Sequence, residues 1–290
     1  MRWVTVATEQ GPRACGVVHE RYVDLNGADP QMPSSMRELL GLAPDQQRKA
    51  WSLLDSGSLS YEPAKTRLLA PVPDPRKIIC IGLNYRDHAA ESGVPVPPEP
   101  VLFSKYPTTL IGHLDRIVLP RVSQEVDYEA ELVIVIGRGG KHISAQNARD
   151  HVGGYTVGHD VSARDWQLKK PAKQWMAGKT FDTFAPTGPE LVTPDEVPDP
   201  HNLGIRLRLN GQTMQDSCTS QLIFGVDELI AYLSRIVTLE PGDLIFTGTP
   251  PGVGMARKPP VWLRPGDVVE VEIDRLGILR NSVIAENEAG

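Results

Sequence analysis

The stretch of residues 127–137 constrains the fold of this chain more than any other, because it joins a buried strand to a pair of carboxylates. Residues 132–136 are an uninterrupted run of leucine, valine and isoleucine, which is typical of a buried β-strand. Glu129 and Glu131 lie two positions apart, and side chains at that spacing leave the same face of a strand. Val133 and Val135 continue that face, so we expect two neighbouring carboxylates on a largely apolar surface.

Such a pair points to a bound cation, because adjacent buried carboxylates repel each other and lose their hydration. Residues 155–160 predict another short strand, which ends in a third carboxylate, Asp160, before a helix expected to begin at Ser162. Three oxygen ligands without a neighbouring cysteine suit Mg²⁺, Mn²⁺ or Ca²⁺ better than zinc. The alternative is that the E-x-E pair marks only a solvated strand face; Asp160 favours the metal site without deciding the question.

Bulk properties exclude several classes of function. The net charge of −6 gives no basic surface for nucleic acid. No apolar run approaches the length of a membrane span, and the first residues lack the apolar core of a signal peptide. The three cysteines are scattered and form no C-x-x-C pair, which predicts reduced thiols and a cytoplasmic protein.

The pattern along the chain predicts an α+β, β-rich fold with two domains. A stiff proline-rich linker at residues 70–75 separates a small N-terminal domain, residues 1–70, from a larger one, residues 71–290. We expect strands at 3–7, 15–18, 22–25, 77–81, 155–160, 244–247 and 268–273, a hairpin at Asn210-Gly211, and helices at 35–42, 44–55 and 226–237.

A second candidate site follows the strand at 77–81. A short helix over residues 85–91 would place His88 and Glu91, three positions apart, on one face. Taken alone, such a pair is usually a surface ion pair. The proline-rich segment 94–100 that follows would suit a lid over a site. The glycine-rich loop 247–254 lacks the lysine of a P-loop, so no nucleotide site is expected there.

Several motifs follow one another in a characteristic order. They are Asn84-Tyr-x-x-His88-x-x-Glu91, Asp127-Tyr-Glu129-x-Glu131, Gly158-His-Asp160, Arg164-Asp-Trp-Gln167, Gly178-Lys179-x-Phe-Asp182 and Thr247-Gly-Thr-Pro-x-Gly-Val-Gly254. In this order they resemble the fumarylacetoacetate hydrolase superfamily over roughly residues 75–290. The segment Lys173-Gln-Trp-Met-Ala-Gly-Lys179 is most similar to the branch called fumarylacetoacetate hydrolase domain-containing protein 2.

The resemblance implies a mixed β-roll catalytic domain with a small β-rich N-terminal domain, a homodimer, and one Mg²⁺ or Mn²⁺ in each subunit. It also implies a role for each matching residue. The groups are metal ligands Glu129, Glu131 and Asp160; a water-activating pair, His88 and Glu91; an oxyanion-stabilising Lys179; and Arg164, Gln167 and Thr249 lining the substrate pocket.

Some of these residues have a purely structural alternative. Arg164 would either pair with Asp160 or Asp165 or bind a substrate carboxylate with its fork. His159 alternates to the other face of its strand, so we expect a packed core histidine. Asp127 shares the face of Glu129, and we expect it at the strand entry or supporting the ligands.

The resemblance implies a small 2-oxo or β-diketo acid as substrate, with a cation that stabilises the enolate formed on it. The first interpretation is hydrolytic C–C cleavage of an acylpyruvate-like or fumarylpyruvate-like substrate. The alternatives are enol–keto tautomerisation and decarboxylation of oxaloacetate, since the same ligands serve all three. A non-catalytic, cation-stabilised scaffold is a further hypothesis, and the presence of His88, Glu91 and Lys179 together argues against it.

Overall fold

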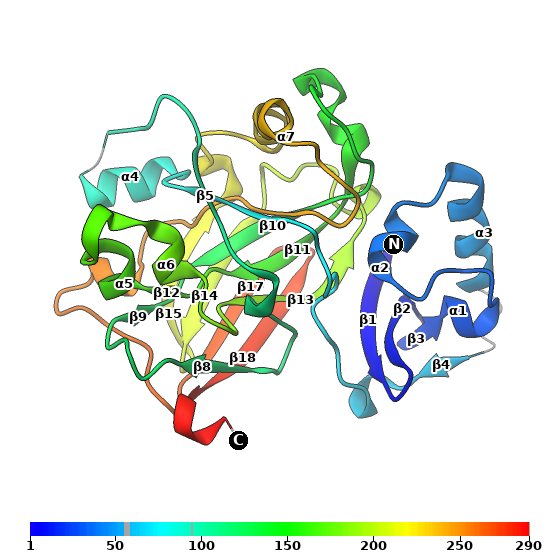
Figure 1. The fold of residues 1–290 in the computed structure, drawn as a ribbon, viewed down its shortest axis with the longest axis horizontal. Coiled ribbons are helices and arrows are strands. Elements are labelled where there is room, and N and C mark those ends of the chain that lie inside the picture. The colour runs from blue at the N-terminus through cyan, green and yellow to red at the C-terminus, as the bar shows by residue number, and fades with distance from the viewer. Residues whose placement is uncertain (55–58, 94, 290) are drawn as a thin grey trace.

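The computed structural model describes residues 1–54, 59–93 and 95–289, and shows an α+β fold built on two large sheets (Figure 1). The larger sheet runs through the whole molecule. Its strands, in spatial order, are β4 (Ser60–Tyr61), β3 (Arg21–Asp24), β2 (Gly11–Val18), β1 (Arg2–Thr8), β13 (Ala185–Val192), β11 (Val152–His159), β10 (Ala130–Ile136), β16 (Leu244–Phe246), β5 (Ile78–Gly82) and β6 (Val101–Ser104), with β7 (Leu110–Ile111) paired to β13.

The second sheet packs against one face of the first, and a short ribbon lies beside the two. Its order is β15 (Gln212–Cys218), β14 (Gly204–Leu209), β17 (Val268–Ile273), β18 (Gly277–Ala285) and β8 (Arg116–Leu119), while β12 (Ser162–Ala163) and β9 (Val126–Asp127) form the ribbon. The helices are α1 (Leu25–Ala28), α2 (Met36–Leu40), α3 (Pro44–Leu54), α4 (Arg86–Ser92), α5 (Arg164–Leu168), α6 (Trp175–Lys179) and α7 (Val226–Ile236).

Strand β10 lies at the centre of the core because both of its faces are covered. Leu132, Ile134 and Ile136 belong to the core shared with the second sheet, while Val133 and Val135 pack in a separate core with residues of the N-terminal segment. All seven residues of β10 are buried. A strand covered on both sides favours apolar residues on both faces, which explains the unbroken run of residues 132–136, while Glu131 is the one charged residue of β10.

The N-terminal segment continues the larger sheet instead of forming a separate one. Strand β1 pairs antiparallel with β13, with Arg2 opposite Val192 and Trp3 opposite Leu191. In Figure 1 the N-terminal strands and helices lie together to one side of the remaining fold. The division at residue 70 stays a prediction, since the pairing of β1 with β13 carries one sheet across it.

Most of the strands and helices expected from the sequence are present. The Asn210-Gly211 hairpin joins β14 to β15 with φ of 53° and 80° at its two turn residues, as a two-residue type I′ turn requires. The helix expected over 44–55 is α3, and Asp55 lies outside the described residues, as does Val94 of the expected lid. The helix start expected at Ser162 is wrong: Ser162 pairs with Asp127 in the β12–β9 ribbon, and α5 begins at Arg164.

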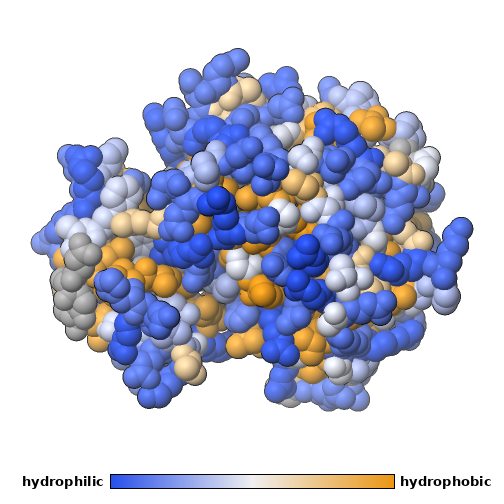
Figure 2. Space-filling model, turned by 180° about the vertical axis from the view of Figure 1, so that it is seen from behind, coloured by the Kyte–Doolittle hydropathy of each residue, from blue (hydrophilic) through white to orange (hydrophobic). Residues whose placement is uncertain are grey.

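The face of the molecule seen in Figure 2 is mainly polar. Figure 2 shows the face opposite to that of Figure 1, where hydrophilic residues cover most of the area and apolar ones gather in smaller patches. Within the described parts of the chain, no helix combines the length and the apolar character needed to cross a bilayer.

Candidate active site

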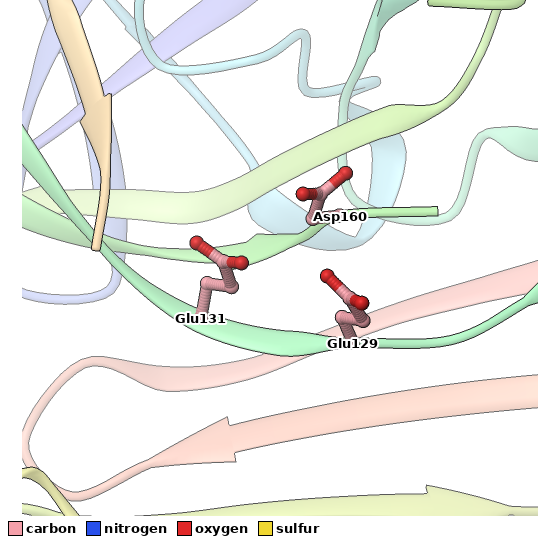
Figure 3. A group of neighbouring side chains, drawn as sticks. All are labelled: Glu129, Glu131 and Asp160. Carbon is pink, nitrogen blue, oxygen red and sulfur yellow. The ribbon is translucent and has the colours of Figure 1, made fainter. Parts of the chain in front are cut away.

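Three carboxylates converge where β10 and β11 meet. The antiparallel register sets Ala130 opposite His159, so Glu131 on β10 and Glu129 just before it lie close to Asp160, which directly follows β11. The backbone N–H of Asp160 donates to the carbonyl of Glu129 at 2.9 Å, which fixes this end of the pair. One oxygen from each side chain lies within 4.8 Å of the others, and all three residues are buried. Figure 3 shows the carboxylates pointing toward one another.

Two cations predicted as site residues contact this cluster directly. Lys179 Nζ donates to Glu129 Oε2 at 2.7 Å and to Asp160 Oδ2 at 2.8 Å. Arg164 Nη2 donates to Glu129 Oε1 at 2.6 Å, and its Nη1 donates to Gln167 Oε1 at 2.9 Å. Burial alone would raise the pKa of Glu129, but Lys179 and Arg164 outweigh it and lower that pKa to about 2. Glu129 is therefore ionised at every physiological pH.

Asp127 holds Arg164 and the glycine-rich loop in place. Its Oδ2 accepts from Arg164 Nε at 2.8 Å, and its Oδ1 accepts from the backbone N–H of Gly254 at 2.7 Å. This supporting position agrees with the expectation for Asp127. Of the alternatives considered for Arg164, an ion pair with Asp160 or Asp165 is wrong. The β9–β12 ribbon instead brings Asp127 beside the Arg164 guanidinium.

Lys105 is a part of the site that sequence reasoning missed. It follows β6, its side chain is fully buried, and its Nζ lies 2.6 Å from Asp160 Oδ1. The same ammonium donates to the carbonyls of Val161 at 3.2 Å and Phe184 at 2.8 Å, and to the carbonyl of Lys179. It thus ties together the segments that carry Asp160 and Lys179.

Among the residues that the structure describes, no lysine or arginine contacts the third carboxylate of the cluster, Glu131, directly. Its Oε2 accepts from the backbone N–H of Gly248 at 2.8 Å. Burial, then the neighbouring charges of Asp160 and Glu129, raise the pKa of Glu131 well above its ordinary value. A divalent cation between the three side chains would offset that repulsion, and carboxylate oxygens suit Mg²⁺, Mn²⁺ or Ca²⁺. The residues present therefore fit a metal ion of this class.

His88 and Glu91 also lie at this site, on helix α4. His88 Nδ1 lies 3.2 Å from Glu91 Oε2, and both oxygens of Glu91 accept from the backbone N–H of Gly252 at 3.1 Å. Asp87 on the same helix accepts from Ser217 Oγ at 2.6 Å. Helix α4 is thus fastened to the glycine-rich loop and to β15, and these contacts hold the histidine over the cavity.

A cavity of about 220 Å³ joins the two groups of residues. The predicted site residues that line it are His88, Glu129, Glu131, Arg164, Gln167, Lys179 and Thr249, and the other lining residues are Ile81, Gly82, Leu83, Phe103, Leu168, Trp175 and Met255. Glu91 and Asp160 lie behind this lining. The cavity is therefore lined by both charged or polar and apolar side chains.

Two neutral side chains supply further hydrogen bonding in the cavity. Thr249 Oγ1 accepts from Gln215 Nε2 at 2.9 Å, which leaves the threonine hydroxyl free to donate. Gln215, a second residue that sequence reasoning missed, also accepts from the backbone N–H of Ala130 at 2.8 Å. Gln167 accepts from Arg164, so its amide N–H₂ is the group available to a ligand.

His159 lies beside the cluster as a core residue. It is buried on β11, as expected for a packed histidine, and burial together with the charge of Lys105 lowers its pKa to about 3. A neutral imidazole next to Asp160 adds no charge to the cluster.

Comparison with known proteins gives a consistent result. Residues 77–284 match the family model described as fumarylacetoacetate (FAA) hydrolase C-terminal. The chain is 55% identical over 262 residues to "Oxaloacetate tautomerase fahd2, mitochondrial" of Xenopus laevis, covering 90% of this chain and 82% of that protein. It is 50% identical over 266 residues to "Oxaloacetate tautomerase FAHD2A, mitochondrial" of Homo sapiens, covering 90% and 83%.

Solved structures are similar over nearly the whole chain. A putative HpcE protein from Mycobacterium smegmatis has a TM-score of 0.88 at 40% identity, covering 99% of this chain and 100% of that one. Maleylpyruvate hydrolase from Sphingobium sp. SYK-6, solved with manganese(II) and pyruvate, has a TM-score of 0.81 at 32% identity, covering 98% and 99%.

Proposed function

This chain belongs to the fumarylacetoacetate hydrolase family, and we propose that it catalyses the enol–keto tautomerisation of oxaloacetate with the help of a divalent cation. The observation that carries the proposal is the position of the His88–Glu91 pair over the same small cavity that Glu129 and Glu131 line. The site thus combines a proton-transfer group with a cation site. The names of the relatives at 55% and 50% identity favour tautomerisation among the reactions such a site supports.

In this proposal Glu129, Glu131 and Asp160 hold the cation, either Mg²⁺ or Mn²⁺. When bound, the cation would supply a Lewis acid that withdraws electrons from the 2-oxo group and its neighbouring carboxylate. Lys179 and Arg164 keep Glu129 ionised and fix both of its oxygens, so the ligand set is held in place before substrate arrives. Lys105 contacts Asp160 Oδ1 and Lys179 contacts its Oδ2, so both oxygens of this carboxylate are fixed as well.

The proton is moved by His88. Tautomerisation removes a proton from the enol oxygen and adds one to C3, so one group that first accepts and then donates can serve both steps. Glu91 engages Nδ1, which leaves Nε2 as the nitrogen available to substrate. Thr249 and Gln167 each offer a neutral donor for the second carboxylate of oxaloacetate.

Hydrolytic C–C cleavage of an acylpyruvate-like substrate is the second candidate. The histidine–glutamate pair suits activation of water, and the maleylpyruvate hydrolase structure belongs to a similar fold. The sequence alone favoured this reaction, whereas the relatives favour tautomerisation. Decarboxylation of oxaloacetate would use the same site without needing a base. The homodimer and the cytoplasmic location remain predictions, and the relatives' names place those proteins in mitochondria.

The experiment is a product analysis by NMR with enol-oxaloacetate and with acylpyruvates, in the presence of Mg²⁺. We expect rapid ketonisation of oxaloacetate and no cleavage of acylpyruvates. His88→Gln should slow ketonisation strongly, should abolish any hydrolysis, and should spare most of any decarboxylation. His142→Gln, at an exposed histidine away from the cavity, is the matched control. Cleavage of acylpyruvates without faster ketonisation would refute the proposal.

A further inference from the structure

Two aromatic side chains separate the active-site cavity from a second pocket. Phe103 on β6 and Trp175 on α6 line the cavity of about 220 Å³ and also line a pocket of about 380 Å³ on the surface. The remaining residues of this outer pocket are Val101, Leu102, Ser104, Lys173, Gln174 and Met176. The same two rings thus line both the cavity that holds the carboxylate cluster and an outer hollow of mixed apolar and polar lining.

The two rings are closely packed where they meet the site. Their centroids lie 5.8 Å apart in an edge-on arrangement, and Lys179 Nζ lies 5.1 Å above the Phe103 ring. At Gly82 a Cβ would lie only 2.2 Å from Cζ3 of Trp175, so the indole rests directly on the backbone of β5. A side chain larger than glycine at position 82 would clash with the indole unless the ring shifted, so the ring and the strand are in close contact at this point.

Trp175 is held at this position by the end of its short helix and by its own packing. Lys179, at the end of α6, forms ion pairs with Glu129 and Asp160. The indole itself contacts the Phe103 ring and the backbone at Gly82. Residues 171–174, before the helix, are exposed, so the position of the indole depends on these buried contacts.

We propose that Phe103 and Trp175 form a partition that restricts this site to 2-oxo acids with a short tail. The head of the ligand, a carboxylate with an adjacent carbonyl, would lie at the carboxylate cluster, and the tail would end against the two rings. The outer pocket, lined by Val101, Leu102 and Met176, would accept an apolar tail if the indole were absent. This inference rests on the proposed function, because it takes a 2-oxo acid as the ligand.

The test measures binding of N-alkyl oxamates of increasing chain length to the Mg²⁺-loaded protein by calorimetry. These compounds keep the carboxylate–carbonyl head but have nitrogen in place of C3, so they have no C2–C3 bond that could be cleaved. Wild type should lose affinity once the tail exceeds about two carbons. The affinity of Trp175→Ala should instead rise about fourfold for each further methylene that enters the outer pocket. For a five-carbon tail, Trp175→Ala should therefore bind more than tenfold more tightly than wild type does.

Two further variants make the result decisive. Trp51→Ala removes an indole from α3, which does not line the cavity, and should keep the wild-type length profile. If circular dichroism shows that Trp175→Ala does not fold, Trp175→Leu replaces it, with the same direction expected. An unchanged length profile in the folded Trp175 variant, or tight binding of long tails by wild type, would overturn the partition.

The outcome is independent of the reaction catalysed. A protein that binds oxamates with the expected length profile but does not ketonise oxaloacetate would keep the partition and lose the proposed function. Ketonisation without any effect of Trp175 on the length profile would do the reverse.

Discussion

Replacing Glu131 by Gln should make the metal-free protein more stable, even though it removes a proposed metal ligand. Glu131 has a raised pKa in the fold because of its burial and then the charges of Asp160 and Glu129. A carboxyl of this kind favours folding below its unfolded pKa, and this contribution is lost as pH rises through the higher folded value. Each pKa unit by which the fold raises this value costs about 1.4 kcal/mol of folding stability once the carboxyl is ionised in both states. Glutamine keeps the side chain's size and its acceptor for Gly248 N–H without the charge.

Glu129→Gln is the matched variant with the opposite expectation. The pKa of Glu129 falls from an ordinary 4.5 to about 2, so its ionised form stabilises the fold above pH 4.5, and this is lost as pH falls toward 2. The difference corresponds to about 3 kcal/mol, and the substitution would leave Lys179 and Arg164 short of a counter-charge. At about 2–4 °C for each kcal/mol in domains of roughly this size, we expect its Tm to fall by about 6–12 °C.

The assay is thermal unfolding of wild type and both variants at about pH 8, in EDTA and in Mg²⁺. At a concentration a hundred times its Kd, Mg²⁺ should stabilise wild type by about 2.7 kcal/mol, or about 5–10 °C. In EDTA, Glu131→Gln should melt above wild type and Glu129→Gln below it, and neither should respond to Mg²⁺ as wild type does. The reasoning fails if Glu131→Gln melts below wild type in EDTA, or if it keeps the full Mg²⁺ response.

Two other predictions concern residues around the cluster. Lys105→Met should destabilise the metal-free protein by about 3–5 kcal/mol, because it leaves the buried Asp160 without the Lys105 ammonium. In thermal unfolding, Mg²⁺ should recover part of this loss of stability. Equal losses in EDTA and in Mg²⁺ would contradict the account. Helix α4 and residues 95–100 should exchange amide hydrogens more slowly when oxalate binds the Mg²⁺-loaded protein, because the ligand would fill the cavity under His88. Hydrogen exchange with and without oxalate measures this, and an unchanged rate would count against a lid.

The Glu129–Glu131 part of the carboxylate cluster was predictable because local spacing decides it. Residues two apart on a strand share a face, which placed Glu129 beside Glu131, and the strand end at Asp160 supplied the third carboxylate. The i, i+3 spacing likewise placed His88 against Glu91. In each case the direction of the side chain follows from the backbone period alone.

The partners of these residues were not predictable, because they depend on which distant segments pair. Lys105 reaches Asp160 although β6 and β11 are not neighbours in the sheet, because the chain just after each of these strands approaches the other in the fold. A buried lysine follows an apolar strand in the sequence just as a surface lysine does, so nothing local distinguishes it. The same holds for Arg164, because pairing of β12 with β9 places Asp127 beside it. The helix start expected at Ser162 was wrong because Ser162 belongs to that ribbon.

The pairing of β1 with β13 has a consequence for fragments of this protein. A piece that begins at residue 71 would leave the backbone N–H and carbonyl groups of β13 near Leu191 and Val192 without their partner strand. An uncovered strand edge invites pairing with another molecule and aggregation. The proline-rich segment at residues 70–75 is therefore a poor place to divide the chain. During synthesis, β1 also cannot pair with β13 until residue 192 has been made.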